Sequence, residues 1–580
     1  MRSKRLRLQL GIIGLVLGAL VTCGAAPPET ESPPVEWLRK NARPFDTCEP
    51  GGTDRDLAPL RAIVGDARIV ALGEVSSGTH EFFQMKRRII EYLATHLGVA
   101  LVGFEEQMSE AYRLNEYVLT GQGDPKELLK RIRRWHKTQE FLDFVEWTRE
   151  FNRSGRGRLQ FFGFDMLGSS DSAAAVVTRF VARAEPAYLD SVTNAYHLVA
   201  SAPREESRYA ATAAAFPASL AAGHKVRVSC WIRTENVHEG AAALWLRGDA
   251  SRKSVVGGNT QDVSGTTPWA PYDFTLDVPD SISIIRFGCM LEGSGTAWFD
   301  SLAVEIDGKP FAGNADLDLT MERTERPVGF SNVGLKGGPY TIDLDSTTVF
   351  AGKRSLRIRR VEPDAPPATV TWPEASAAAT RVLEHLEAGR DRLVSSSAPS
   401  EVDGAILNAR TIAQMSDVNA GRAGRRDVLM VENIVRMLDQ APPGSKMVLW
   451  ADNLRLARRV SIGASLASRY GREVVVFGFA FHEGSYSTVA QGGDPPGEKV
   501  AQPSSPGSLE WVCHSIGIPR FILDLRSAAA DPGAEASSWL AQPLPMRSYA
   551  SQASPEQIPV GRYYDALIFI DHTTPSKSLP

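Results

Sequence analysis

The feature that most constrains the fold of this chain is a set of short apolar runs, each followed by an acidic residue, in both the first and the last third of the sequence. The runs are residues 67–72 (ARIVAL) before Gly73-Glu74, residues 99–104 before Glu105, residues 159–164 before Asp165, and residues 446–451 (KMVLWA) before Asp452. Continuous apolar runs of this length, separated by amphipathic segments such as residues 81–97, are typical of parallel strands buried on both faces. The sequence therefore predicts an α/β fold with a parallel sheet and many helices.

The middle of the chain has a different pattern. From about residue 207 to residue 360, short alternating segments such as residues 225–232 (KVRVSCWI) are punctuated by Gly, Pro, Asp and Asn. Many short strands without helices between them favour an all-β sandwich, and the segments around Trp269 and Trp298 resemble the jelly-roll modules of carbohydrate-binding proteins. We therefore expect an α/β domain in two parts, residues 37–204 and 372–580, interrupted by a β-sandwich at residues 205–361 and followed by a linker at residues 362–371.

The N-terminus predicts export. Several Lys and Arg residues precede an apolar run, residues 8–21, that is short for a membrane span. We expect residues 1–23 to be a signal peptide and residues 24–36, rich in Pro, Glu and Ser, to be a linker. Cys23 resembles the lipidated Cys of bacterial lipoproteins, although Thr22 stands where a smaller residue is usual. Two outcomes stay open, a lipid anchor on Cys23 as the one membrane attachment or ordinary cleavage near Ala25, and both give a periplasmic or outer-surface protein.

Composition excludes several classes of function. The net charge is only −4 and no basic block occurs beyond the first residues, so no nucleic-acid partner is expected. The five Cys residues are far apart and no H-E-x-x-H motif occurs, so no metal is expected. No P-loop or Rossmann glycine motif opens a βα unit, so no nucleotide cofactor is expected either. Cys230 and Cys289 lie in the same β unit, where they either form a disulfide or are buried thiols.

The acidic residues after the apolar runs are the candidate functional residues. The carboxyl ends of parallel strands meet at one edge of a sheet, which is where α/β proteins place their sites. Carboxylates crowded together there have shifted pKa values, as acid–base catalysis requires. The same acids can also serve only as helix caps, and their spacing alone leaves both interpretations open.

A family resemblance favours the functional interpretation. Segments in both α/β parts, in the same order, resemble the erythromycin esterase family. They are residues 72–83 (LGEVSSGTHEFF), Phe104-Glu105, residues 115–119 (NEYVL), residues 161–166 (FFGFDM), Arg426-Asp427, Glu432-Asn433, residues 449–453 (LWADN), residues 477–484 (FGFAFHEG) and residues 563–575 (YYDALIFIDHTTP). The resemblance implies hydrolysis of an ester or lactone by water, in a cleft lined by Glu and His.

The family's residues carry over only in part. The resemblance makes Glu74 and Glu105 the two catalytic glutamates, and Lys86 stands where an Arg is frequent. Ser77 replaces the His expected as general base. Two further His positions correspond to Asp452 and Arg455, so three imidazoles are absent. Since imidazole is the side chain that most readily exchanges protons near neutral pH, another group must take over this role.

We expect the replacement to come from the carboxylates or from His80. A glutamate can act as the base if burial beside Asp452 raises its pKa by a few units. His80, one helical turn after Ser77, either reaches the cleft or only packs in its helix. The predicted catalytic residues are Glu74, Glu105, Asp452, Lys86 and His80, and the predicted substrate-binding residues are Ser77, Arg455, Asn453, Asp165 and Glu140. His136, in the segment WHKTQEF, either lines the cleft or belongs to an amphipathic helix.

Two functions stay open. The first is an exported hydrolase of an ester, lactone or related acyl bond, although we do not expect macrolides as substrates. The second is an esterase fold without catalysis that captures a glycan or small molecule at the cell envelope. In both, the sandwich can attach the protein to polysaccharide, for which exposed aromatics such as Trp269 are the candidates, while Trp298 is expected in the core.

Overall fold

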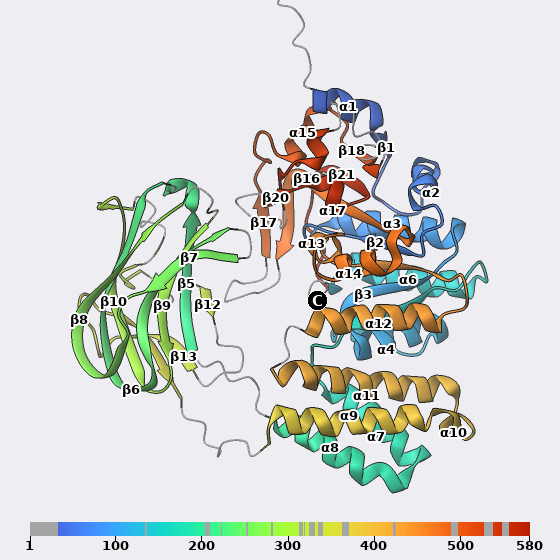
Figure 1. Ribbon diagram of the computed structural model, residues 1–580, viewed down its shortest axis with the longest axis horizontal. Helices are drawn as coiled ribbons and strands as arrows, with labels where there is room; N and C mark the ends of the chain where they lie inside the picture. Colours follow the sequence, from blue (N-terminus) through green and yellow to red (C-terminus); the bar gives the residue numbers. More distant parts are fainter. Residues whose placement is uncertain are drawn as a thin grey trace, which may run out of the picture.

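The protein is described by a computed structural model that shows two bodies side by side, a helix-rich domain and an all-β domain (Figure 1). It describes residues 33–579, apart from residues 134–135, 203–208, 222, 251–252, 280–281, 283, 312–316, 318, 324–330, 334–339, 362–369, 422–424, 489–496, 527–537 and 548–555. The predicted signal peptide and Cys23 therefore lie outside the described residues, as does most of the predicted 362–371 linker. No described helix has the length and apolar character needed to cross a membrane.

The helix-rich domain is built on one nine-stranded sheet in which six neighbouring strands are parallel. Their order is β21-β16-β2-β15-β3-β4. The parallel strands are β2 (Ile69–Leu72), β3 (Val99–Gln107), β4 (Gln160–Asp165), β15 (Lys446–Trp450), β16 (Val474–Thr488) and β21 (Ala566–Thr573). Antiparallel strands β18 (Arg520–Asp524), β1 (Arg43–Pro44) and β17 (Gly497–Ala501) extend it. The predicted parallel α/β sheet is confirmed.

Strand alternation divides the apolar residues of the sheet between two cores. Val70 and Leu72 face a core shared with α2 (Pro59–Val64), α3 (His80–His96) and α6 (Gln139–Arg153). Ile69 and Ala71 face the opposite core. Helices of that second layer are α7 (Asp171–Ala184), α8 (Leu189–Ser201), α9 (Trp372–Ala388), α11 (Pro399–Asn419), α12 (Arg426–Gln440) and α14 (Ser461–Tyr470). Helix layers on both faces explain why the strands read as continuous apolar runs.

Local capping sets where several helices begin. The Thr138 side chain accepts a hydrogen bond from the Phe141 amide at the start of α6. At α9, Thr371 and Glu374 form a reciprocal capping box, which begins at the last residue of the predicted linker. Helix α1 begins at Pro33 and runs to Asn41, so the last four residues of the predicted 24–36 linker are helical. Proline fits the first turn of a helix because its missing N–H would have no partner there.

The all-β domain spans β5 (Tyr209–Pro217) to β14 (Ser355–Arg360) and is a ten-stranded antiparallel assembly with its own core. The predicted insertion of a β unit into an α/β fold is confirmed. Residues 225–232, expected as a short strand, belong to one long strand, β6 (Lys225–Ala250), which bends at bulges and pairs with several neighbours. Cys230 and Cys289 are buried free thiols in this core.

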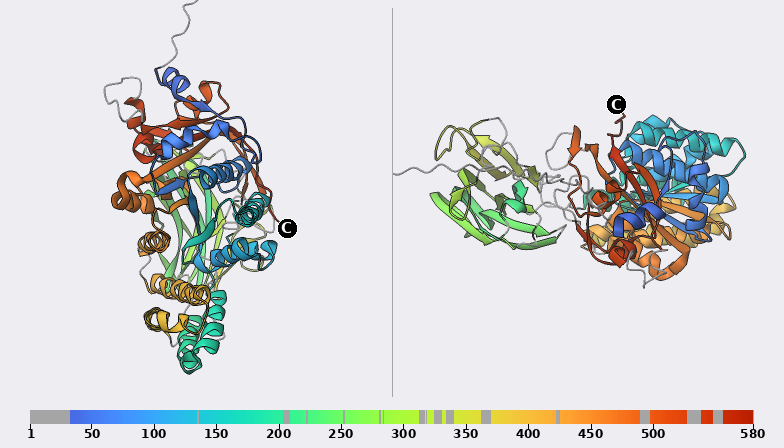
Figure 2. Two further views of the ribbon diagram at one scale, coloured as in Figure 1. Left: turned by 90° about the vertical axis from the view of Figure 1, so that its right-hand side faces the viewer. Right: turned by 90° about the horizontal axis from the view of Figure 1, so that it is seen from above.

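The two domains meet only loosely. A view from above also keeps the sandwich to one side of the helix-rich domain (Figure 2, right). None of the described sandwich strands packs extensively against a described helix or strand of the α/β domain. The sandwich therefore adds a surface beside the α/β domain without completing its core.

Candidate functional site

The predicted acids gather at one edge of the parallel sheet. Strands β2, β15, β3 and β4 are consecutive neighbours, and their carboxyl ends deliver Glu74, Asp452, Glu105 and Asp165 in that order. Strand β15, from the second half of the chain, lies between β2 and β3, so Asp452 stands between the two glutamates. All four acids lie in a row at the sheet edge where α/β proteins bind ligands.

Glu74 is buried and paired. Its Oε2 accepts hydrogen bonds from Lys86 Nζ at 2.6 Å and from Trp450 Nε1 at 3.0 Å, and its Oε1 accepts one from the Ser77 hydroxyl. Burial alone would raise the pKa of Glu74, but the Lys86 charge and these hydrogen bonds outweigh it and lower the pKa. Glu74 is therefore ionised, and because three donors already bind its carboxylate, it is not available as a base.

Lys86 is fully buried beneath the site. Its Nζ lies 4.6 Å from the centre of the Trp450 ring and 5.6 Å from that of Phe479, in addition to its contact with Glu74. Burial lowers the pKa of Lys86 to about 8, although Glu74 acts in the opposite direction. The structure places this predicted catalytic residue behind Glu74, where it holds the carboxylate in position instead of facing a substrate.

Glu105 has the opposite electrostatic environment. The pKa of Glu105 is raised to about 7: burial is the largest cause, the charge of Arg455 lowers the pKa, and the charge of Asp452 raises it. Arg455 Nε lies 2.8 Å from Glu105 Oε2, yet its N–H does not point at an acceptor among the described residues. A second arginine, Arg426, reaches Glu105 Oε1 at 3.4 Å. Glu105 can therefore both take and release a proton near neutral pH.

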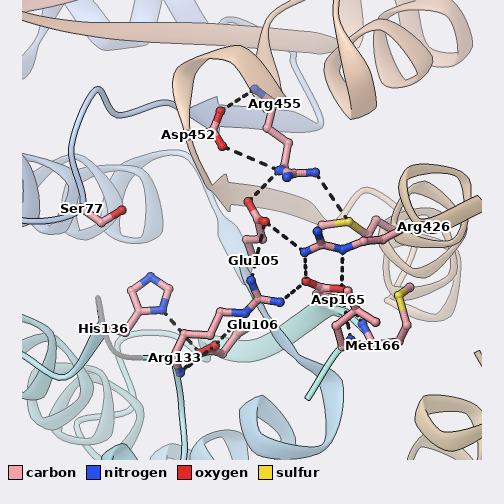
Figure 3. A network of polar contacts seen from close by, with 12 residues as sticks. Ser77, Glu105, Glu106, Arg133, His136, Asp165, Met166, Arg426, Asp452 and Arg455 are labelled. Carbon is pink, nitrogen blue, oxygen red and sulfur yellow. Dashed lines mark hydrogen bonds and ion pairs between the residues drawn. The ribbon is translucent and has the colours of Figure 1, made fainter. Parts of the chain in front are cut away.

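Asp165 anchors the arginines around Glu105. It is wholly buried and pairs with both Arg133 and Arg426, while its Oδ1 accepts the Met166 backbone N–H at 2.8 Å. Burial alone would raise the pKa of Asp165, but the two arginines lower it overall. The network is drawn in Figure 3, where Arg133, Arg426 and Arg455 converge on Glu105 from different directions. Asp165, predicted to bind substrate, is paired with Arg133 and Arg426 in this structure.

Asp452 and its neighbours hold the loop after β15. The Asp452 side chain caps the short helix α13 (Asn453–Leu456) by accepting the Arg455 backbone N–H at 2.8 Å, and it remains partly exposed. Arg455 also pairs with Asp427 at 3.0 Å. Asn453 is buried and bonds the backbone of Phe479 in both directions, which ties α13 to β16. Asn453 is thus a structural residue, whereas Asp452 and Arg455 face the site.

His80 and Glu140 form a separate pair. The two His80 ring nitrogens contact Glu140 Oε1 at 2.7 Å and Glu49 Oε1 at 2.8 Å, so neither is left for a substrate. The Glu140 hydrogen bond is the largest of the effects that raise the pKa of His80 to about 9. Glu140 also accepts a hydrogen bond from the Lys577 backbone N–H, and the next residue, Ser578, forms an isolated β-bridge with Thr138. The structure therefore does not bring His80 together with Glu74 and Glu105; its ring pairs with Glu140 and Glu49 instead.

His136, for which the sequence left a cleft-lining and a helical position open, lies before the start of α6 and beside Glu106. It is 2% exposed, its ring stacks on Phe141 with centroids 4.7 Å apart, and its Nδ1 lies 3.6 Å from Glu106 Oε2. Figure 3 shows the other ring nitrogen turned toward the space between Ser77 and Glu105. The neighbouring Trp135 lies outside the described residues.

Two of the arginines around Glu105, Arg133 and Arg426, were not among the predicted site residues. Arg133 belongs to a basic stretch, RIRR, that reads as a solvated loop, and Arg426 appeared only inside a family segment. Apolar periodicity gives no signal for a charged residue that turns inward to a distant acid. Among the described residues no group of three or more His, Cys, Asp or Glu is arranged to hold a metal ion, because the acids are paired with Lys and Arg.

Comparison with known proteins places this site in a family. The erythromycin esterase family model matches residues 94–244 and 358–573, more than half of the chain. Erythromycin esterase type II of Escherichia coli is 28% identical over 166 residues, which are 28% of this chain and 39% of that protein. The putative hydrolase YbfO of Bacillus subtilis is 28% identical over 152 residues, 26% of this chain and 33% of that protein. The chain thus aligns with well under half of these relatives.

Solved structures share the fold over most of the chain. A Bacillus cereus protein and a protein described as a succinoglycan biosynthesis protein each align with a TM-score of 0.58 at 18% identity, covering 94% of this chain and 98% of theirs. At that identity the likeness concerns the fold alone. The family match on both sides of the inserted sandwich, together with the two glutamates at the sheet edge, leads to one conclusion: this chain is a member of the erythromycin esterase family.

Proposed function

We propose that the protein hydrolyses an ester, lactone or related acyl bond by carboxylate-assisted attack of water. The observation that carries this proposal is the pair of environments at Glu74 and Glu105: one carboxylate is locked by Lys86 with a lowered pKa, and the other has a pKa raised to about 7. Carboxylates with separated proton affinities at one site are the usual arrangement for acid–base chemistry.

Glu105 is the base in this mechanism. Its carboxylate takes a proton from water as the water oxygen attacks the acyl carbon, and the carbonyl π electrons move onto oxygen. Arg455, partly exposed beside Glu105, stabilises the resulting oxyanion by its charge. Collapse of the tetrahedral intermediate re-forms the carbonyl and breaks the bond to the leaving oxygen, which takes a proton from an acid at the site, and Glu105 releases its own proton to water. Lys86 has no direct part in oxyanion stabilisation because Glu74 and two aromatic rings enclose it.

The test is hydrolysis of an ester and lactone panel by the mature protein beside Glu105→Gln and Glu74→Gln. Loss of a general base lowers rates by about 10²–10⁴-fold, so Glu105→Gln should fall by at least about 100-fold. Glu127→Gln is the matched control, because that carboxylate is 63% exposed and pairs only with a surface lysine. Turnover that is absent in the wild type, or unchanged in Glu105→Gln, would reject the hydrolase and leave ligand capture without catalysis.

A second proposal concerns the sandwich, which we propose binds polysaccharide. Trp231 stacks on Phe350 with centroids 3.8 Å apart, Trp269 lies 5.9 Å from the same ring, and Phe350 is 40% exposed. Partly exposed aromatic rings gathered in this way present flat apolar faces suited to stacking on sugar rings. Trp298 is 7% exposed and donates a hydrogen bond to Asp345, so it belongs to the interior.

Affinity electrophoresis in gels containing cellulose, chitin or xylan derivatives tests this surface. The wild type and the control Val500→Ala, an exposed apolar residue on β17, should be retarded by one of these glycans. Trp269→Ala should lose most of that retardation. Equal mobility of all three proteins in every gel would reject a glycan-binding role for these rings.

We also propose that the protein is exported and, through Cys23, lipid-anchored at the periplasmic or outer surface. The support is the basic and apolar sequence of residues 1–23. Labelled palmitate should enter the wild type and not Cys23→Ser. Export without label in either protein would favour ordinary signal cleavage over a lipid anchor.

A further inference from the structure

The chain lacks imidazoles at three family positions, but the imidazole of His136 lies at the same site. His136 precedes α6 and lies in a box of aromatic rings, with Phe141 stacked on it and Phe83, Phe104 and Trp450 edge-on at centroid distances of 5.9–6.4 Å. This packing fixes the plane of the ring. A rigid, buried imidazole beside two acidic strand ends is not explained by apolar packing alone, because its polar atoms need partners.

The two ring nitrogens of His136 have different surroundings. Nδ1 is buried, has no hydrogen-bond partner among the described residues, and faces the Glu106 carboxylate at 3.6 Å. Glu106 is held in place by the Arg133 backbone N–H, which donates to both of its oxygens at 2.9 and 2.7 Å. A carboxylate opposite Nδ1 favours a proton on that nitrogen, which leaves Nε2 as the nitrogen available to the site.

Nε2 is directed into the site. In Figure 3 this nitrogen points toward the space bounded by Ser77 and Glu105, on the side away from Glu106. The charge of His136 also contributes to lowering the pKa of Glu74, so the ring lies within electrostatic range of both glutamates.

We infer that His136 is a catalytic residue, the general acid that protonates the leaving oxygen through Nε2. This inference rests on the proposed hydrolase function. As the tetrahedral intermediate collapses, the bond between the acyl carbon and the leaving oxygen breaks, and that oxygen takes the Nε2 proton. Neutral His136 and protonated Glu105 remain; Glu105 then releases its proton to water and His136 regains one. His136 and Glu105 thus divide the two proton transfers between them.

The experiment compares two esters of the same acid, one with an alkyl alcohol and one with p-nitrophenol as the leaving group. Departure of p-nitrophenolate needs no proton, whereas departure of an alkoxide does. For His136→Gln we expect kcat/KM to fall by about 100-fold or more with the alkyl ester and by less than about 3-fold with the nitrophenyl ester. A merely structural role would lower both rates equally, and Glu105→Gln should lower both.

A second variant guards against misfolding of His136→Gln. Glu106→Gln keeps the ring and an acceptor for the Arg133 amide, and we expect a smaller loss that is again confined to the alkyl ester. In the wild type, nitrogen-15 NMR should show the neutral His136 ring protonated on Nδ1. Equal losses with both esters in both variants, or a neutral ring protonated on Nε2, would overturn the inference. Absence of wild-type turnover would instead reject the hydrolase itself, and the inference with it.

Discussion

At the scale of single residues, two glutamates one strand apart show how surroundings, and not residue type, set proton affinity. Glu74 meets a buried ammonium, an indole N–H and a hydroxyl, which together stabilise its charge. Glu105 is also largely removed from water, but the arginines near it are shared with Asp165 and Asp452, whose negative charges oppose its ionisation. The division of roles between the two glutamates follows from this difference in partners.

Variants of the neighbours should move the pH dependence in opposite directions. A base must be deprotonated, so kcat/KM should fall as the pH drops through about 7. Arg455→Gln removes a charge that lowers the pKa of Glu105 and should move the midpoint of that fall to higher pH. Asp452→Asn removes a charge that raises it, keeps the helix cap, and should move the midpoint to lower pH. Shifts of the same sign in both variants would contradict Glu105 as the titrating base.

His80 should affect stability and not catalysis. Its pKa is raised to about 9 in the folded protein, so the stability it adds is complete below its unfolded value of 6.5 and is lost as the pH rises through about 9. His80→Gln should therefore lower the free energy of unfolding at pH 6 by about 1–2 kcal/mol, a value limited by the solvent-exposed Glu49, and leave it nearly unchanged at pH 10. Urea unfolding at both pH values, with the exposed His572→Gln as control, measures this.

Sequence alone identified the acids of the site but not their partners. Glu74, Glu105, Asp165 and Asp452 follow apolar strands, which is a local pattern. The pairing of Asp165 with Arg426 joins residues far apart in the chain and leaves no local pattern. His80 is a candidate from the sequence because it follows Ser77 by one helical turn. Its hydrogen-bond partner Glu140 belongs to another helix, so the sequence gives no local sign of this contact.

At the scale of elements, the loop that follows β2 is held by backbone contacts. The Gly78 carbonyl accepts hydrogen bonds from the Ser487 amide at 2.8 Å and the Ser576 amide at 2.9 Å, so β16 and the segment after β21 both press on this loop. A Cβ at Gly78 would overlap the Ser487 carbonyl. Ser77, which bonds Glu74, is the adjacent residue, and its position depends on this close approach.

Gly78→Ala should therefore damage the site more than the fold. Overpacking of this kind costs about 1–3 kcal/mol, which calorimetry can detect as a lowered Tm, and we expect ester hydrolysis to fall by more than 10-fold because Ser77 moves. Gly52→Ala is the control, since nothing lies within 4 Å of a Cβ at that position. An unchanged hydrolysis rate in Gly78→Ala would show that the loop does not position Glu74.

At the scale of the whole molecule, the sandwich is an independent body carried between α8 and α9. These two helices pack on each other, so the α/β core is continuous without the insertion. The sequence predicts this arrangement. The middle segment has alternating strands with no helices between them, and this pattern does not fit a parallel sheet that is covered by helices. The sequence pattern does not predict the order of the strands in the sheet. Strand β15 lies between β2 and β3 because of packing between residues far apart in the chain.

Replacing residues 203–369 by a short Gly/Ser linker should leave the α/β domain folded. We expect its thermal transition to stay within a few degrees of the corresponding transition in the full chain, because the described strands of the sandwich make no extensive contact with it. Differential scanning calorimetry of both proteins gives the answer. A deletion variant that is unfolded or insoluble would show that the sandwich supports the α/β core.

The position of β15 also has a consequence for how this chain is made. Both neighbours of β2, β15 and β16, belong to the second half, so the strand that leads to Glu74 has no partner until residues near 446 leave the ribosome. At typical synthesis rates that wait is on the order of tens of seconds. During it, two unsatisfied strand edges are exposed, and such edges pair readily with other chains. The nascent first half is therefore a natural client for chaperones, and early termination of translation should yield aggregates and not a half-sized folded domain.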